Sequence, residues 1–462
     1  MKEKNMKLKK YFGDRAFYKM AVTLSLPIML QNLITNLVSL IDNIMVGSLG
    51  TEQMSGVSIV NQITLIYTLA LFGGMSGLGI FTAQFYGKKD NEGVLYTVRC
   101  KLLLAFGLCV IGAAVLVLFD EPLISLFLHE SGSEGDIALT LSFGKTYLRY
   151  YLIGLLPLAL TQALAGTLRE TDNTFVPMMA GLIAVVTNCI FNYLLIFGKL
   201  GFPEMGVAGA AIATGFSRMV ELAVLVIYII RKRKHYPFFF VGGFYVPGEL
   251  VRSMTLKGMP LLVNEVLWSG GMSALSVAFS LHGLSVVAAY SISSTVSNLF
   301  SVAFMALGVA IGIVAGQNLG AKEYDKAEDN VRKFIVFSVG VSVLFGALMF
   351  ICGPSVTRFY NTGEEEKSLA AFLIRVWACV MPMHAFSNAS YFTLRSGGKT
   401  VVTFFFDCGS VWIIMVPVAF ALYYFTDLSI YYVYPIVMGL EIFKDLVGYI
   451  LIKKKVWIRT IV

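Results

Sequence analysis

The stretch LVSLIDNIMVGSLG carries a single carboxylate, Asp42, near the end of an apolar segment that begins at Met20. A charged side chain inside a membrane costs about 3 kcal/mol or more unless it faces water, a partner or an ion. Other polar residues share its helical face because they recur every three to four positions: Asn32, Asn36, Ser39 and Asn43. We therefore predict a functional Asp42. For the Asn and Ser residues, hydrogen bonding between helices is the alternative, since such residues often join helices in membranes.

A second pair of polar residues lies far along the chain, in the run VVTNCIFNYLL. Asn188 and Asn192 are four residues apart, so their amides lie on one face of a helix. Thr214 follows in the next apolar segment. Amide and hydroxyl oxygens are ligands of the kind that suit a hard cation such as sodium. Helix bridging by the two amides is again the alternative.

The composition identifies the kind of protein in which these residues lie. The 462 residues are 57% hydrophobic and 14% charged, with a mean hydropathy of +0.75. Soluble domains carry roughly 25% charged residues, so this composition indicates a multi-pass membrane protein. The net charge of +8 does not indicate nucleic-acid binding, because the basic residues lie in short connectors and at the termini.

Twelve segments are long and apolar enough to span a membrane as helices of about 20 residues. Their centres lie near Leu33, Leu69, Leu108, Leu152, Val185, Leu222, Met272, Phe300, Val341, Cys379, Val411 and Val437. The connectors alternate between basic ones, such as RKRK at 231–234, and neutral or acidic ones, such as GEEE at 363–366. The positive-inside rule then places both termini in the cytoplasm.

The chain repeats itself. Pro27 and Pro260 are separated by the same 233 positions as Gln84 and Gln317, and LRETDNT recurs as LRSGGKT after 226 positions. Two halves of six spans each share one orientation, which predicts a pseudo-twofold axis along the membrane normal. We therefore expect an all-α membrane protein with twelve transmembrane helices in two six-helix lobes. The predicted parts are an N-terminal lobe (1–231), a cytoplasmic linker (232–250) and a C-terminal lobe (251–462).

Together these motifs resemble the multidrug and toxic compound extrusion (MATE) family of cation-coupled antiporters. The resemblance rests on DNIMVG, LRETDNTFVP, NEVLW, GQNLGAKEYDKA and LRSGGKT in this order, and it covers nearly the whole chain. It implies export of amphipathic, often cationic compounds by alternating access, driven by inward flow of sodium ions or protons. It also implies that Asn188, Asn192 and Thr214 surround Asp42. Some relatives have Asp where this chain has Asn192, which leaves one fixed negative charge rather than two.

The resemblance implies a second site for substrate or coupling ion in the C-terminal half. Glu265 lies three residues before Trp268, and a carboxylate beside an indole suits an organic cation. Asn264 adjoins it, and Asp407 is a further candidate in the eleventh span. His384 stands where one branch of the family has Asp, and a histidine can take up protons near neutral pH. The alternatives are a polar partner for Glu265 and a structural role for His384.

We also predict helix-turn ion pairs between Arg218 and Glu221 and between Glu441 and Lys444, which are three residues apart in each case. No ATP-binding loop, hydrolase motif or His/Cys metal set is present, so we expect no enzyme and no cofactor beyond the coupling ion. We expect a monomer in a bacterial inner membrane that contacts lipid and small amphipathic substrates but no nucleic acid. The alternative function is that of a flippase for lipid-linked oligosaccharides or lipids from the same superfamily.

Overall fold

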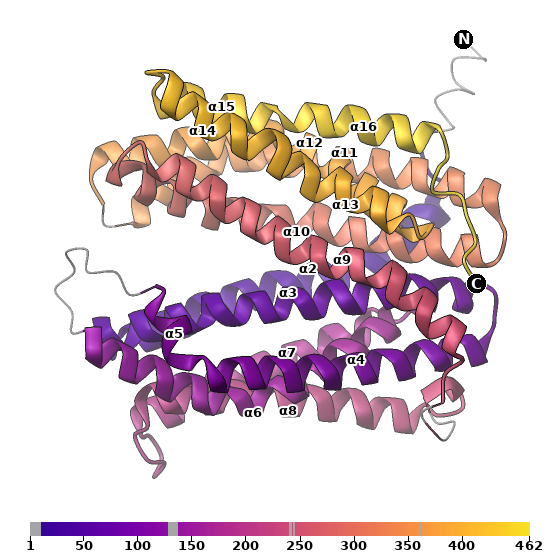
Figure 1. Cartoon of the computed structure of the whole chain (residues 1–462), viewed down its shortest axis with the longest axis horizontal. Helices are drawn as coiled ribbons and strands as arrows, with labels where there is room; N and C mark the ends of the chain where they lie inside the picture. The colour runs from indigo at the N-terminus through magenta and orange to yellow at the C-terminus, as the bar shows by residue number, and fades with distance from the viewer. Residues whose placement is uncertain (1–10, 128–136, 240–242, 244, 361) are drawn as a thin grey trace. The chain divides into compact units, whose positions relative to one another are not determined.

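The computed structural model describes residues 11–127, 137–239, 243, 245–360 and 362–462. Two charged segments, the N-terminal lysines and the acidic connector near residue 130, lie outside this part. The described residues form helices, with no β-strand among them (Figure 1). This confirms the predicted all-α class.

In the first half of the chain, the helices are α2 (Arg15–Gly47), α3 (Thr51–Gly87), α4 (Asn91–Leu118), α5 (Asp120–Ser125), α6 (Ile137–Glu170), α7 (Phe175–Phe197) and α8 (Gly206–Arg231). A short 3-10 helix, η1 (Pro237–Phe239), follows. The second half contains α9 (Gly248–Ser280), α10 (Leu284–Gly320), α11 (Tyr324–Val356), η2 (Thr357–Phe359), α12 (Glu364–Ser396), α13 (Thr400–Gly409), η3 (Ser410–Met415), α14 (Val416–Phe425), α15 (Ile430–Gly439) and α16 (Glu441–Lys453).

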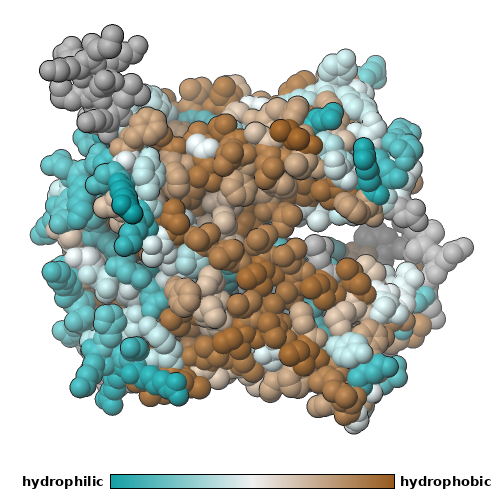
Figure 2. Space-filling view, turned by 180° about the vertical axis from the view of Figure 1, so that it is seen from behind, coloured by the Kyte–Doolittle hydropathy of each residue, from teal (hydrophilic) through white to brown (hydrophobic). Residues whose placement is uncertain are grey.

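Eleven segments of the described chain are long and apolar enough to cross a membrane, and they include the first eleven predicted centres. The predicted twelfth span is divided into α15 and α16, which meet at Leu440. The eleventh span runs through α13, the π-helical turn η3 and α14. Figure 2 shows a hydrophobic band through the middle of the visible face, with hydrophilic residues gathered at its left and right ends, as a bilayer requires.

The internal repeat extends to the backbone. Helices α9, α10 and α11 begin 233 residues after α2, α3 and α4, and α2 and α9 have 33 residues each. Pro27 and Pro260 lie inside these two helices. The turns after α3 and α10 each place a lysine in the left-handed region, Lys89 at φ 62° and Lys322 at φ 58°. The same sequence spacing therefore produces the same helix ends.

The chain divides into two compact units. Unit 1 comprises Met1–Met29, Ala83–Asp90 and Thr255–Val462, and unit 2 comprises Leu30–Thr82 and Asn91–Met254. Helices α2 and α3 therefore contribute to both units. The lobe boundaries predicted from sequence stay a prediction.

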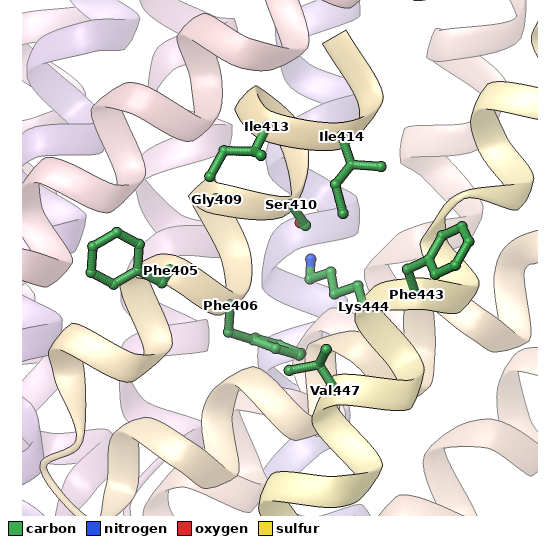
Figure 3. Close-up of a pocket in the computed structure, with 9 residues that line it drawn as sticks. All are labelled: Phe405, Phe406, Gly409, Ser410, Ile413, Ile414, Phe443, Lys444 and Val447. Carbon is green, nitrogen blue, oxygen red and sulfur yellow. The ribbon is translucent and has the colours of Figure 1, made fainter. Parts of the chain in front are cut away.

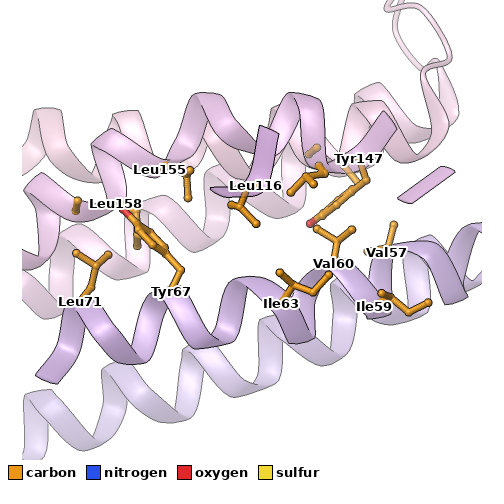
Figure 4. Packing of buried hydrophobic residues seen from close by; sticks show 14 of the residues in the cluster. Val57, Ile59, Val60, Ile63, Tyr67, Leu71, Leu116, Tyr147, Leu155 and Leu158 are labelled. Atoms are coloured by element: carbon orange, nitrogen blue, oxygen red, sulfur yellow. The ribbon is translucent and has the colours of Figure 1, made fainter. Parts of the chain in front are cut away.

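Within unit 2, α8 packs on α6 and α7, and α6 packs on α4. Figure 4 shows the apolar cluster that joins α3 to α6, in which the rings of Tyr67 and Tyr147 lie among Val60, Ile63 and Leu158. All five of these side chains are buried. In a membrane, such contacts stabilise through close packing rather than through loss of water-exposed apolar surface. The cluster holds the helices beside the polar residues of α7 and α8.

Within unit 1, α12 packs on α10, α11 and α16. Near the end of α3, Gly87 lies against the backbone of Gln317, and Gly320 lies against the backbone of Gln84. These two contacts are related by the repeat, since each glycine follows its glutamine by three residues. A Cβ atom at either glycine would overlap the backbone of the opposing helix, so only glycine permits this approach.

Candidate functional site

Asp42 lies on the last turns of α2, in unit 2, and its side chain is half-buried. One carboxylate oxygen, Oδ1, accepts a hydrogen bond from Nδ2 of Asn192 at 2.6 Å. The bond joins residues 150 positions apart and connects α2 to α7. The carboxylate that the sequence singles out is thus held by a neutral amide of another helix.

The two asparagines of α7 face the same way, as their four-residue spacing predicts. Asn192 Nδ2 also lies 3.2 Å from Asn188 Oδ1, and Asn188 Nδ2 lies 3.3 Å from Thr214 Oγ1. With the Asn188 amide turned over, its nitrogen lies 2.9 and 3.2 Å from the two oxygens of Asp42. In either orientation, the structure brings the four residues predicted for cation coupling into one cluster: Asp42, Asn188, Asn192 and Thr214.

One oxygen of this cluster has no hydrogen-bond partner. Asn192 is 1% exposed, and its Oδ1 is buried without a donor. A buried amide oxygen without a partner is costly, and most such groups in proteins have one. Because an amide presents oxygen instead of nitrogen after a half-turn, Asn192 is able to offer this oxygen to a cation beside Asp42. The donor set of carboxylate, amide and hydroxyl oxygens therefore fits a hard cation.

The charges nearest the cluster lie on α8. Arg218 pairs with Glu221 at 2.8 Å, which confirms the predicted helix-turn ion pair. Arg218 also attracts the Asp42 carboxylate through space. Tyr147 of α6, buried in the apolar cluster of Figure 4, hydrogen-bonds Thr214. Sequence spacing revealed the Arg218–Glu221 pair but not the influence of Arg218 on Asp42 or the Tyr147 contact, since both connect separate helices.

The rest of the polar face on α2 is not drawn into this cluster. The side chains of Asn32, Asn36, Ser39 and Asn43 are exposed. Ser39 donates to the backbone carbonyl of Thr35 at 3.0 Å, a bond within its own helix. Helix periodicity correctly gives a shared face, but of these five polar residues only Asp42 is joined to α7 by a described hydrogen bond.

A second polar network lies in unit 1. Tyr391 of α12 donates to Glu265 Oε1 at 2.8 Å, and Asn264 of α9 donates to Asp407 Oδ2 at 2.9 Å. Asn264 Nδ2 also lies 3.5 Å from the Tyr391 hydroxyl, so one chain of polar groups runs from Glu265 to Asp407. Trp268 packs against an apolar cluster of α9, α10 and α12. The proposed pairing of Trp268 with Glu265 around an organic cation stays a prediction.

The network continues through the ammonium of Lys444 on α16. This nitrogen lies 2.8 Å from Asp407 Oδ1 and 3.5 Å from Glu441 Oε1. His384 Nδ1 lies 3.5 Å from the same Glu441 oxygen, and its ring stacks on Trp377 with centroids 4.5 Å apart. The predicted pair within α16 is therefore present, but the closer partner of Lys444 is Asp407, 37 residues away.

Sequence reasoning missed Tyr391 and Lys444 as members of this network. Nothing in the local sequence of either residue points to a partner that lies over a hundred residues away or on another helix. Of the described residues, no group of three or more His, Cys, Asp or Glu side chains could hold a metal ion. Amide and hydroxyl oxygens are therefore central to any cation site in this part of the chain.

Three kinds of comparison with known proteins agree on the relatives of this chain. A family model described as MatE matches residues 27–194 and 260–421, one stretch in each half. The probable multidrug resistance protein YoeA of Bacillus subtilis (strain 168) is 26% identical over 413 residues, which cover 87% of this chain and 86% of that protein. The probable multidrug resistance protein NorM of Thermotoga maritima is 25% identical over 413 residues, which cover 89% of this chain and 87% of that protein.

A solved structure shows the same fold. It is described as an outward-facing conformation of a multidrug resistance MATE family transporter of the MOP superfamily, with a TM-score of 0.85 and 20% identity. The match covers 97% of both chains. The two chains thus share their fold over nearly their whole length.

Proposed function

The chain belongs to the MatE family, the multidrug and toxic compound extrusion transporters, and we propose that it exports amphipathic, cationic compounds in exchange for sodium ions or protons. As a member of this family, it is a multi-pass membrane transporter rather than an enzyme. The probable multidrug resistance names of its relatives support the substrate class. The observation that carries the coupling is the Asp42 carboxylate, held among neutral side chains in a membrane-spanning helix.

A carboxylate in this position needs a counter-charge, because the amide of Asn192 and, when turned over, that of Asn188 donate hydrogen bonds to it without neutralising it. The nearest guanidinium, Arg218, already pairs with Glu221. A sodium ion or a proton neutralises Asp42 more completely than hydrogen bonds do. The unpartnered oxygen of Asn192 gives a metal ion a second ligand.

Coupling requires that ion binding favour one arrangement of the helices over the other. In the arrangement described here, the nitrogen of Asn192 bonds to Asp42 and connects α7 to α2. Turning the amide to present its oxygen breaks this bond, so the contact between α2 and α7 differs between ion-bound and ion-free protein. We propose that this difference drives alternating access. Glu265 provides a carboxylate for the organic cation in the second half of the chain.

The test is export of a fluorescent cationic dye from vesicles that contain the purified protein, first under a sodium gradient and then under a pH gradient. We expect Asp42→Asn to abolish gradient-driven export while leaving thermal unfolding and monodispersity close to wild type, because the substitution keeps size and hydrogen bonding. Asp427→Asn is the matched control, since it makes the same change at an exposed carboxylate between α14 and α15. The control should export dye at the wild-type rate.

The gradient that works identifies the ion. Sodium-driven export supports the oxygen cluster as a metal-ion site, whereas export driven by pH alone makes Asp42 a proton carrier and the asparagines its scaffold. Gradient-driven export by Asp42→Asn at the wild-type rate would contradict the proposed coupling. If neither gradient moves dye through the wild-type protein, drug antiport is wrong and lipid or lipid-linked sugar transport becomes the leading alternative.

We further propose that the protein works as a monomer in the inner membrane of a bacterium, with both termini in the cytoplasm. The basic connector at 231–234 and the acidic one at 363–366 fall on opposite sides in this topology, as the positive-inside rule favours. Cysteines introduced at exposed Lys234 and Glu365 check the orientation. A membrane-impermeant thiol reagent should label only the second from outside intact cells.

A further inference from the structure

The ammonium of Lys444 is a buried positive charge enclosed by two carboxylates. Its side chain is 10% exposed, and those of Asp407 and Glu441 are 14% and 4% exposed. The nitrogen also lies 5.4 Å from the centre of the Phe406 ring, within the range of a cation–π contact. Figure 3 shows the side chain reaching from α16 towards the turn of α13 and η3, between Phe406 and Ser410.

The other side of this ammonium is mainly apolar. The hollow beside it, about 200 Å³ in volume, is lined mainly by apolar side chains: Phe405, Phe406, Ile413, Ile414, Phe443 and Val447. Ser410 adds a hydroxyl, but this donates to the backbone carbonyl of Asp407 at 2.7 Å. The attraction felt by Lys444 is therefore directed to the two carboxylates.

The groups facing these carboxylates and the adjacent Asp445 come from two further helices, α9 and α12. Asn264 of α9 donates to the second oxygen of Asp407, and His384 of α12 faces Glu441. Ser387 of α12 donates to Asp445 at 2.6 Å. With a neutral imidazole, Asp407, Glu441 and Lys444 together carry one net negative charge, so a single fixed cation serves two acids.

The contrast with Asp42 lies in what neutralises the charge. A carboxylate inside a membrane requires a counter-charge or a proton, and a tethered ammonium meets this need without exchange with solvent. We propose that Lys444 is the built-in cation of the C-terminal half: it occupies the position between Asp407 and Glu441 that a metal ion would otherwise take. This half therefore binds no metal ion of its own. We further infer that metal ions exchange only at the Asp42 cluster, and this second statement rests on the proposed function.

This assignment predicts that removing the ammonium creates a new cation site. Methionine fills most of the volume of lysine but leaves Asp407 and Glu441 without a counter-ion. In the Asp42→Asn background, where the first cluster no longer competes, we expect Lys444→Met to make thermal unfolding sodium-dependent. Stabilisation by a ligand that binds only the folded state should raise the Tm by about 1–3 °C for each tenfold increase in sodium above its Kd.

The measurement is Tm in detergent at about pH 8, where carboxylates are ordinarily ionised, with choline replacing sodium to hold ionic strength constant. Two matched variants in the same background separate charge from packing. Lys444→Arg keeps the cation and should show no sodium response. Lys444→Met with Asp407→Asn removes one acid together with the lysine and should lose most of the response.

Each result decides the proposal. A sodium response of Lys444→Met in this background supports it, and so does a variant that is monodisperse only when sodium is present. A folded variant with no sodium response overturns it, as does a misfolded one that sodium does not rescue. A sodium response in Asp42→Asn with Lys444 intact overturns the confinement of metal-ion exchange to Asp42. Because the response is read without Asp42, it stands or falls separately from the coupling mechanism proposed above.

Discussion

At the scale of single residues, the two polar networks neutralise their carboxylates differently. Asp42 faces side-chain amides, which donate hydrogen bonds but no charge, whereas Asp407 faces an ammonium at 2.8 Å. Asn192 is decisive in the first network, because its nitrogen holds the carboxylate and its oxygen is unpartnered. A substitution that removes this amide should affect both stability and ion binding.

We expect Asn192→Leu, which keeps the approximate volume, to lower the free energy of unfolding by about 1–3 kcal/mol, since the half-buried Asp42 carboxylate loses its donor. If sodium is the coupling ion, its affinity should fall about tenfold or more, the equivalent of about 1.4 kcal/mol. Chemical denaturation and binding of radioactive sodium measure the two effects. Asn36→Leu makes the same change at an exposed position of α2 and should leave both quantities nearly unchanged. Equal losses in the two variants would show that the Asn192 amide has no special role.

How far the sequence predicts the site depends on the distance between partners along the chain. The shared face of Asn188 and Asn192 follows from helical periodicity alone. The closeness of α7 to Asp42 rested on the family resemblance, because no spacing rule connects residues 150 positions apart. For the same reason, the pairing of Lys444 with Asp407 escaped prediction, while its weaker pairing with Glu441, one helical turn away, did not.

At the scale of helices, hydropathy and the repeat predict most of the architecture. A span of about 20 apolar residues is visible in any window of that length, and the 233-residue offset recurs in the first residues of three helix pairs. The break at Leu440 between α15 and α16 and the π-helical turn of η3 were not predicted. The mean hydropathy of a window of about 20 residues does not reveal such breaks, because they change the path of the backbone without changing the composition of the window.

The reciprocal glycine contacts of α3 and α10 give a prediction at this scale. Gly87→Ala and Gly320→Ala should each destabilise the protein by about 1–3 kcal/mol or more, since a new Cβ atom would overlap rigid backbone at Gln317 or Gln84. Thermal unfolding in detergent measures the effect. Gly340→Ala on α11 is the matched control, because open space surrounds that position. It should stabilise by about 0.5–1 kcal/mol through its helix propensity. Tolerance of alanine at both Gly87 and Gly320 would show that the two helices are free to separate there.

At the scale of the whole molecule, the two homologous halves share a backbone but differ in where their charged side chains lie. The backbone retains the repeat down to the left-handed lysines Lys89 and Lys322. The carboxylates do not repeat: the 233 offset pairs Glu265 with Asn32 rather than with Asp42. On the proposed assignments, one half exchanges an ion with its surroundings and the other keeps a lysine in its place. Duplication preserves the helical framework while each half acquires its own charge chemistry.

On the proposed assignments, the tethered ammonium of Lys444 limits the concentration gradient that the transporter can build. A lysine that stays in place carries no charge across the membrane. If one monovalent ion enters for each monovalent organic cation that leaves, the exchange is electroneutral, and a voltage worth about 2.3 kcal/mol per charge at roughly 100 mV does no work on it. A tenfold ion gradient then sustains at most a tenfold substrate gradient. Dye export should therefore stay constant when the membrane potential of the vesicles is clamped at different values, and acceleration by an inside-negative potential would reveal a second cation that enters in each exchange.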